Sequence, residues 1–312
     1  MPNPVPALRE PQVSSPAKTW AAPRAAAARA HGAARRPHGR RRLPALAWSA
    51  ALLVFLAALP GAGGCNSSYQ TTSRPLCIAG STSVQPFAEK LAEVYMHRHP
   101  GVRIDVQGGG SSAGIYAATQ GAADLGASSR ELLGEEKKLL EIPIAFDGIA
   151  VIVHPSNPLT TITLAEIRQI FSGAVNNWSA LRLPPHAIDL ITREEGSGTR
   201  EAFEHLVMSK EEITPAALVQ DSNGSVREIV AGDSHALGYI SAGLVDDRVK
   251  ALAIDGVLPT RDNIKNHTYK LVRRFLFVAR AAPAGPCKDF VDFVLGPNGQ
   301  KILEDEGLVG VK

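Results

Sequence analysis

The sequence predicts an α/β fold made of two doubly wound lobes that two crossing strands join. Short apolar segments such as residues 102–106, where Val102, Ile104 and Val106 alternate with charged residues, predict β-strands. Turns rich in glycine and hydroxyl side chains follow several of these strands, and apolar residues at helical spacing follow the turns. This alternation is typical of doubly wound sheets, in which ligands bind beyond the carboxyl ends of the strands.

The first 64 residues are predicted to be a cleaved signal peptide with an extended positively charged region. Five arginines between residues 35 and 42 precede an uncharged apolar run, residues 43–59, and the sequence then reaches Gly63-Gly64-Cys65. This order is similar to a bacterial lipoprotein signal, so we expect Cys65 to carry a lipid that anchors the protein to a membrane. An uncleaved membrane anchor is the alternative, although the apolar run is shorter than the ~20 residues that a spanning helix needs. A misassigned translation start would also explain the long leader.

Removal of the leader reverses the charge of the chain. The whole sequence has a formal net charge of +3, but residues 65–312 hold 24 basic and 29 acidic residues. This balance argues against a nucleic-acid surface. A bound anion would therefore be held by local dipoles and a few placed cations rather than by a broad positive field.

The predicted mature chain of 248 residues is long enough for two lobes. Residues 65–74 are polar and are expected to form a tether. Cys77 and Cys287 either form a disulfide or remain free, and the sequence alone leaves both alternatives open. No spacing of ligand side chains indicates a metal or cofactor site.

The first lobe, lobe I, is predicted to comprise residues 75–152 and 273–312. A strand at residues 76–79 leads into the turn GSTSVQP, residues 80–86, and then into a helix that Ser83 is expected to cap. Two further strands end in hydroxyl-rich turns. One precedes GGGSSAG and a helix that ends before Gly121; the other, DLGASS, presents Ser128, Ser129 and Arg130.

Lobe II is predicted to comprise residues 153–272. A β-prone segment at 149–153 is interpreted as the crossing into it, and 271–278 as the crossing back. Capping boxes are expected at Thr163 with Glu166, and at Ser225 with Glu228. A strand is expected at Ala236–Ser241, and two helices at the C-terminus complete lobe I.

The stretch TREEGSGT, residues 192–199, lies where an apolar strand turns into a helix. It combines a fixed cation, Arg193, with two carboxylates, two hydroxyls and two glycines. Glycines without Cβ let a bound oxyanion approach the free N–H groups at the start of a helix. An ordinary capped helix start with solvated charges would look the same in isolation. Several hydroxyl-bearing turns on one sheet edge favour the anion site.

Six motifs in this order resemble the phosphate-binding subunit of bacterial phosphate ABC transporters, in its shorter branch. They are GSTSVQP, VQGGGSSAG, ADLGASSR, IFSGAVNNWS, TREEGSGTREAF and NGSVREIVAGDSHALGYI, and the likeness covers roughly residues 75–312. The resemblance implies a type II periplasmic binding fold, a dehydrated phosphate ligand and an ABC permease as partner. It further implies an extracytoplasmic monomer without cofactor or metal, and no enzymatic activity.

The resemblance also implies which residues contact phosphate. In lobe I the contacts would come from Thr82 and Ser83 and from Ser111 with Ser112 beside it. In lobe II, Arg193 would pair with phosphate, and Glu195 stands where the family usually has an aspartate that pairs with this arginine. The remaining matches are Ser197, Gly198, Thr199, Ser129 and, as outer candidates, Ser81, Ser128 and Arg130.

Ser129 departs from the pattern of the longer branch. There an aspartate follows Gly-Ala-Ser and accepts the proton of monohydrogen phosphate, and this carboxylate rejects sulfate because two acceptors would face each other. With Ser129, either Glu195 supplies the acceptor or Arg130 and other groups have reorganised the site. A binding protein of the same fold for sulfate, molybdate or a small organic anion is therefore the alternative function.

Enzymatic interpretations fit the motif less well. A serine hydrolase with Ser197 as nucleophile would need glycine at position 195, which is Glu195. A P-loop enzyme would need a lysine that Gly198-Thr199-Arg200 lacks.

Overall fold

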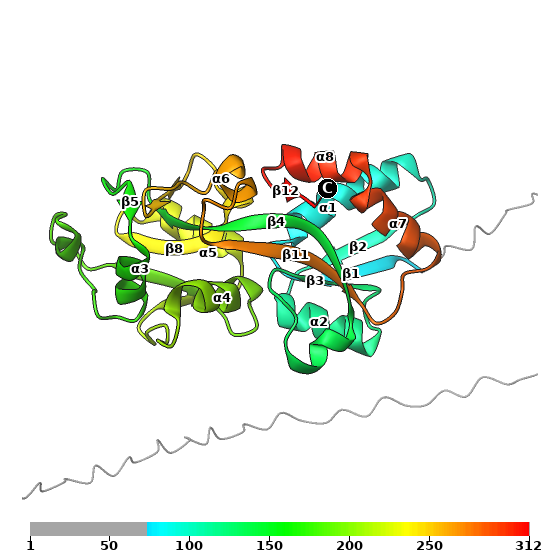
Figure 1. The fold of residues 1–312 in the computed structure, drawn as a ribbon, viewed down its shortest axis with the longest axis horizontal. Helices are drawn as coiled ribbons and strands as arrows, with labels where there is room; N and C mark the ends of the chain where they lie inside the picture. The colour runs from blue at the N-terminus through cyan, green and yellow to red at the C-terminus, as the bar shows by residue number, and fades with distance from the viewer. Residues whose placement is uncertain (1–73, 312) are drawn as a thin grey trace, which may run out of the picture. The chain divides into compact units, whose positions relative to one another are not determined.

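The computed structural model describes residues 74–311, and within them two groups of strands form around separate cores. Strands β2, β1, β3, β11, β4, β8, β6 and β7 are neighbours in that order (Figure 1). We use lobe I for the elements around β1–β3 and lobe II for those around β6–β8. The strands are β1 (Leu76–Gly80), β2 (Ile104–Gln107), β3 (Leu125–Ser128), β4 (Leu140–Val153), β5 (Thr161–Ile162), β6 (Asp189–Arg193), β7 (Leu218–Gln220), β8 (Ala236–Ser241), β9 (Lys250–Ala251), β10 (Ala253–Ile254), β11 (Val272–Ala279) and β12 (Val309–Gly310).

Helices cover both faces of each group of strands, as a doubly wound fold requires. In lobe I, α1, α7 and α8 share one apolar core with the sheet, and α2 packs on the other face with β11. The helices are α1 (Gln85–Arg98), α2 (Ser111–Gln120), α3 (Leu164–Phe171), α4 (Gly198–Phe203), α5 (Asn223–Gly232), α6 (Arg261–Lys265), α7 (Gly285–Leu295) and α8 (Pro297–Asp305). One-turn 3₁₀ helices lie at Gly134–Lys138, Trp178–Leu181 and Ala242–Leu244, and a π-helical turn, Glu204–Met208, extends α4.

The parallel strands of each lobe end at one edge. β1 pairs in parallel with both β2 and β3, and β6 pairs in parallel with both β7 and β8. The turns that follow β1, β3 and β6 therefore project from the carboxyl edges of their sheets. In lobe II, the rings of Phe203 and Tyr239 are stacked and that of Phe171 packs against them at a tilt, which fixes the helix after β6 against the sheet.

Two long antiparallel strands, β4 and β11, cross between the lobes (Figure 1). They confirm the predicted α/β architecture with two crossing strands. In their register Arg273 lies directly opposite Asp147, and the two side chains form a buried ion pair with 2.8 Å between Arg273 Nη2 and Asp147 Oδ2. Burial raises the pKa of the Asp147 carboxyl, and Arg273 opposes this effect by favouring the ionised form.

Local capping predictions are confirmed at one helix and wrong at two. Thr163 caps α3 in a capping box with Glu166. Ser83 does not cap α1, which begins after Val84, because partners in lobe II and on β11 occupy the Ser83 hydroxyl. At α5 the helix begins three residues earlier than expected, and Ser222 caps it by accepting from the Ser225 N–H.

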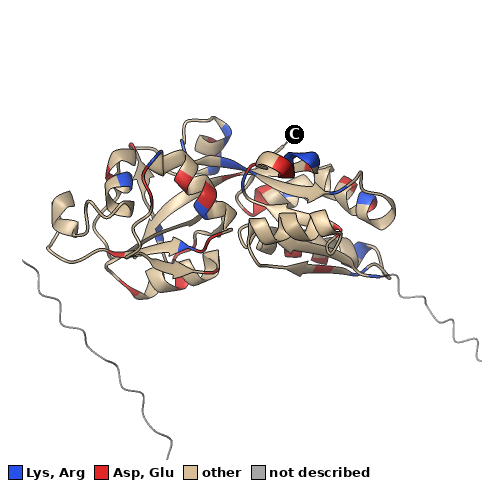
Figure 2. Cartoon of the chain, turned by 90° about the horizontal axis from the view of Figure 1, so that it is seen from below, with Lys and Arg blue, Asp and Glu red and all other residues tan. Residues whose placement is uncertain are grey.

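Several predictions concern residues outside the described range. Cys65, the leader and nearly all of the expected tether lie before residue 74. Within the range, Cys77 and Cys287 are both free thiols. No helix between residues 74 and 311 has the length and apolar character needed to cross a membrane. Figure 2 shows acidic and basic residues interspersed over the described part of the chain.

Candidate functional site

Turns from the two lobes meet at the carboxyl edges of their sheets. The Ser112 N–H donates to the Gly196 carbonyl oxygen at 3.1 Å, and the hydroxyls of Ser83 and Thr199 lie 2.6 Å apart. Both contacts join lobe I to lobe II. The structure thus brings the predicted hydroxyl-bearing turns together around TREEGSGT.

Arg193 is the central cation of this meeting point. Its side chain is 1% exposed, and its Nε and Nη2 donate to Glu194 at 2.9 and 2.8 Å. Nη2 also donates to Thr82 Oγ1 at 3.1 Å. Within residues 74–311, Nη1 is buried and has no hydrogen-bond partner. An unpaired buried donor is costly, so this nitrogen marks a position where an acceptor would bind.

The predicted pairing of Arg193 with Glu195 is wrong. Strand β6 ends at Arg193, and the carboxylate of the next residue, Glu194, folds back against the guanidinium group. Glu195 is exposed and lines a surface cavity with Arg200 and Glu204. The carboxylate that orients Arg193 therefore comes from the residue before the predicted one.

Three residues of the motif form the start of α4 as predicted. Ser197 is the cap, and its hydroxyl accepts from the Arg200 N–H at 3.3 Å. Gly198 and Thr199 are buried in the first turn. A Cβ on Gly198 would lie 2.1 Å from Ser111 Oγ and 2.8 Å from Ser129 Oγ. Glycine at position 198 is thus what permits the close approach of the two lobes.

Three buried serines form a hydroxyl cluster on the lobe I side. Ser81 Oγ donates to Ser129 Oγ at 2.9 Å, and Ser111 Oγ lies 3.3 Å from Ser129 Oγ. The Ser129 N–H also donates to Ser111 Oγ at 3.1 Å. Ser128, in contrast, donates its hydroxyl to the Arg130 carbonyl oxygen and stabilises the turn. Ser81, Ser111 and Ser129 retain hydrogen-bonding capacity for a ligand because hydroxyls both donate and accept.

Arg130 pairs with one carboxylate in its own lobe, Glu136, and with one in lobe II, Glu201. Its Nη1 and Nη2 donate to Glu136 at 2.6 and 2.9 Å, and this contact lowers the pKa of the Glu136 carboxyl. Arg130 Nε lies 2.6 Å from Glu201 Oε2 on α4, and Ser112 Oγ donates to Glu201 Oε1 at 3.2 Å. We call the contacts of Arg130 and Ser112 with Glu201 the latch. The charge of Arg130 and the side chain of Ser112 are thus committed to a contact between lobes.

The sequence did not predict two residues that contact the Ser83 hydroxyl, Asn223 and Arg273. Asn223 and Arg273 both donate to Ser83 Oγ, at 2.9 and 3.2 Å, and Asn223 is 1% exposed. A signal for Arg273 was available, because it interrupts an otherwise apolar crossing strand. Asn223 lies in the quoted NGSVREIV motif, but its composition resembles any helix start.

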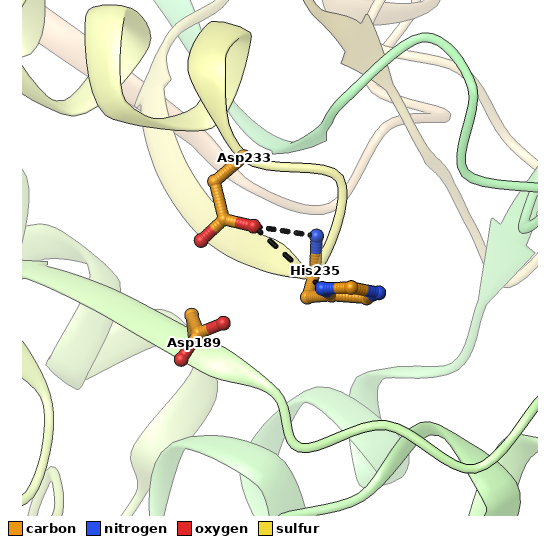
Figure 3. A group of neighbouring side chains, drawn as sticks. All are labelled: Asp189, Asp233 and His235. Carbon is orange, nitrogen blue, oxygen red and sulfur yellow. Dashed lines mark hydrogen bonds and ion pairs between the residues drawn. The ribbon is translucent and has the colours of Figure 1, made fainter.

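The sequence predicted no metal site, and the described chain contains one group with suitable ligand types. The side-chain ligand atoms of Asp189, Asp233 and His235 lie within 4.8 Å of one another (Figure 3). Asp189 begins β6 and His235 precedes β8, whereas Arg193 ends β6. The group therefore lies at the opposite edge of the lobe II strands from the Arg193 site.

Comparison with known proteins agrees with this geometry. A family model for the PBP superfamily domain matches residues 66–298. The chain is 31% identical to phosphate-binding protein PstS of Bacillus subtilis over 278 residues, which cover 84% of this chain and 91% of that protein. The chain belongs to the PBP superfamily and, within it, to the PstS family. PstS of Borreliella burgdorferi is 26% identical, with coverage of 79% and 94%.

Solved structures extend the likeness to PstS-type folds. A Clostridium perfringens protein, described as a phosphate ABC transporter substrate-binding protein with bound phosphate, has a TM-score of 0.74 and 41% identity. The matched region covers 77% of this chain and 100% of the C. perfringens chain. A phosphate transport receptor from Vibrio cholerae has a TM-score of 0.64 and 37% identity, covering 75% and 99%. The α/β fold of this PstS-family chain is thereby confirmed.

Proposed function

We propose that this protein binds inorganic phosphate between its lobes outside the cytoplasm and delivers it to an ABC permease. The observation that carries the proposal is Arg193 Nη1, which is buried and has no hydrogen-bond partner among residues 74–311. The same guanidinium donates through Nη2 to Thr82, next to the point where the Ser83 and Thr199 hydroxyls of the two lobes meet. A tetrahedral oxyanion presents acceptors in several directions, which matches donors that converge from two lobes. The named PstS relatives and the phosphate-bound C. perfringens structure support the same ligand.

The proposed contacts are few but sufficient. We assign them to Arg193 and to backbone or hydroxyl groups of residues that line the meeting point of the lobes. These are Thr82, Ser83, Ser111, Ser129, Ser197, Gly198 and Thr199. Ser112 lies beside them, but its N–H and its hydroxyl are held by Gly196 and Glu201. A charge-assisted hydrogen bond contributes about 1.5–3 kcal/mol net, and micromolar affinity requires about 8 kcal/mol after association costs. A broad basic surface is not needed.

Lobe closure is the proposed mechanism of capture. We assign lobe I to residues 75–152 and 273–312 and lobe II to residues 153–272, so that β4 and β11 act as the hinge. The proposed ligand groups come from both lobes, and a bound anion therefore favours their approach. We further propose that the protein acts as a monomer and not as an enzyme, in keeping with relatives named as binding proteins of transporters.

The function is tested by calorimetric titration of the full chain, purified in detergent, with phosphate, sulfate and molybdate. We expect phosphate to bind at micromolar concentration or below and to outcompete the other two anions. If the protein preferred sulfate or molybdate, that anion would be assigned as the ligand instead of phosphate. Binding of none of the three would refute the proposal.

The alternative ligand sulfate deserves a test because a serine occupies position 129. Glu194 is paired with Arg193 and Glu195 is exposed, so Ser129 is the proposed acceptor for the proton of monohydrogen phosphate. We expect Ser129→Ala to weaken phosphate binding about tenfold, or about 1.4 kcal/mol, and to change sulfate binding less. Competition titrations measure both affinities. An equal loss for both anions would contradict this role.

The latch is expected to contribute to closure without touching the ligand. Glu201→Gln removes the charge that faces Arg130, and we expect phosphate affinity to fall about fivefold, or about 1 kcal/mol, because a partly exposed ion pair contributes little more. Glu204→Gln is the matched control, since Glu204 pairs with Arg200 inside lobe II. Equal effects of the two substitutions on the calorimetric Kd would exclude the latch.

Localisation follows from the leader. We propose that Cys65 is lipidated after cleavage at residue 64, which would hold the binding lobes near the permease. Cys65→Ser is expected to move the protein from the membrane fraction to the soluble fraction, as followed by immunoblotting. Persistent membrane association would instead indicate an uncleaved anchor.

A further inference from the structure

Asn223 reaches two hydroxyl groups of lobe I from the first turn of helix α5 in lobe II. Its Nδ2 donates to Ser83 Oγ at 2.9 Å and to Thr82 Oγ1 at 3.3 Å. Its Oδ1 accepts from the backbone N–H of Ser241 at 3.1 Å. Because a backbone N–H can only donate, this contact fixes the orientation of the amide. The NH₂ group of Asn223 must therefore face Thr82 and Ser83.

Each of these hydroxyls also receives a second donor. Arg193 Nη2 donates to Thr82 Oγ1 at 3.1 Å, and Arg273 Nη2 donates to Ser83 Oγ at 3.2 Å. A hydroxyl group has two acceptor lone pairs and one hydrogen. Two incoming donors occupy both lone pairs, so each hydroxyl can only donate its hydrogen. The Ser83 hydrogen is therefore donated to Thr199 Oγ1, 2.6 Å away, which leaves the Thr199 hydrogen free, and the Thr82 hydrogen has no acceptor among residues 74–311.

A ring of buried hydrogen bonds holds this arrangement in place. Arg273 donates to Asp147 Oδ2 through Nε and Nη2, at 2.9 and 2.8 Å, and Ser241 Oγ donates to Asp147 Oδ1 at 2.8 Å. Ser241 holds Asn223, and Asn223 and Arg273 both hold Ser83, which closes the ring. We call these five residues the buried ring; each is at most 6% exposed. It includes both lobes and both crossing strands.

We propose that Asn223 is a positioning residue for the anion site. With Arg193 and Arg273 it makes Thr82 an obligate donor to the bound anion and Ser83 an obligate donor to Thr199, whose own hydrogen is then left for the anion. This inference rests on the proposed function. A free hydroxyl loses rotational freedom when the ligand binds, whereas these hydroxyls are oriented beforehand. This orientation reduces the entropy cost of binding. This part of the site therefore favours ionised oxygens, which accept hydrogen bonds more strongly than a protonated oxygen does.

The test begins with Asn223→Asp in the full chain, titrated with inorganic phosphate. The substitution keeps the shape of the side chain but replaces the NH₂ donor with an acceptor. The Thr82 hydrogen would turn toward it and away from phosphate, and the Ser83 hydrogen would turn away from Thr199, which could then donate to Ser83 instead of phosphate. We expect the Kd to rise about 100-fold, since two hydrogen bonds to an ion are lost and a negative charge is added. Asn266→Asp is the control, because it adds the same charge at an exposed position that ends α6.

A double-mutant cycle separates positioning from a merely structural role. Asn223→Ala is combined with the pair Thr82→Val and Ser83→Ala, and thermal unfolding without phosphate reports the stability of every variant. If Asn223 acts through the hydroxyls, its removal should raise the Kd about tenfold in the wild-type background and less than twofold when they are absent. Additive effects in the cycle would overturn the proposal.

The role of Asn223 and the binding of phosphate are refuted by different results. If the unmodified protein binds phosphate but Asn223→Asp leaves the Kd within threefold, the role of Asn223 is refuted and the proposed function stands. If the unmodified protein binds no phosphate, both are refuted.

Discussion

Arg193→Ala is expected to raise the Kd for phosphate about 1,000-fold, which corresponds to about 4 kcal/mol. The substitution removes the buried guanidinium, including the Nη1 that has no partner among residues 74–311. It also leaves Glu194 without its cation next to the anion, so repulsion adds to the loss of donors. Titration calorimetry measures the change.

The fold should survive this substitution. Glu194 is 27% exposed at its side chain and is solvated once Arg193 is gone. Thermal unfolding in the absence of phosphate should therefore change little. Arg280→Ala, which removes an exposed arginine, is the matched control and should leave the Kd unchanged. An Arg193→Ala protein that binds phosphate as tightly as the unmodified protein would place the site elsewhere.

Gly198→Ala is expected to reduce phosphate affinity about 100-fold or more, through geometry rather than charge. The added Cβ would lie 2.1 Å from Ser111 Oγ and 2.8 Å from Ser111 Cβ, distances that no relaxed contact allows. Because Gly198 belongs to lobe II and Ser111 to lobe I, the strain would be relieved by holding the lobes apart. Small-angle scattering with saturating phosphate should show no compaction for this variant.

Gly232→Ala provides the matched control for the added methyl group. Gly232 also lies in a helix of lobe II, but a Cβ there has no atom within 4 Å. We expect unchanged phosphate affinity and normal compaction. If Gly198→Ala behaved in the same way, the proposed contact between Gly198 and Ser111 on closure would be wrong.

The fold could be predicted from local sequence because strands, turns and helices alternate with clear periodicity. Alternation at Val102, Ile104 and Val106 and the capping box at Thr163 are short-range signals, and they specify elements without knowledge of the rest of the chain. The same reasoning predicted that the hydroxyl-bearing turns share a sheet edge. The resemblance to the PstS family rests on six motifs in a fixed order, which is more specific than any single turn.

The parts of the site that the sequence did not predict depend on long-range partners. Ser83 looks like a helix cap locally, but its partner Arg273 is 190 residues away. The choice between Glu194 and Glu195 is set by where β6 ends, and two adjacent glutamates give no local reason to prefer either. Arg130 has the charge of a ligand residue, but Glu136 and Glu201 lie beside it and pair with that charge. The partners of these side chains are set by which residues the fold brings together, and not by their neighbours in the sequence.

The latch has a consequence for transport that binding measurements alone do not reveal. Glu201 is 29% exposed and meets Arg130 outside the set of groups assigned to phosphate, so its attraction acts on loaded and unloaded protein alike. Any strengthening of this contact would increase the population of unloaded receptors shaped like loaded ones, and these would compete for the same permease. A weak, water-accessible latch thus keeps phosphate itself as the main signal that a receptor is ready to dock.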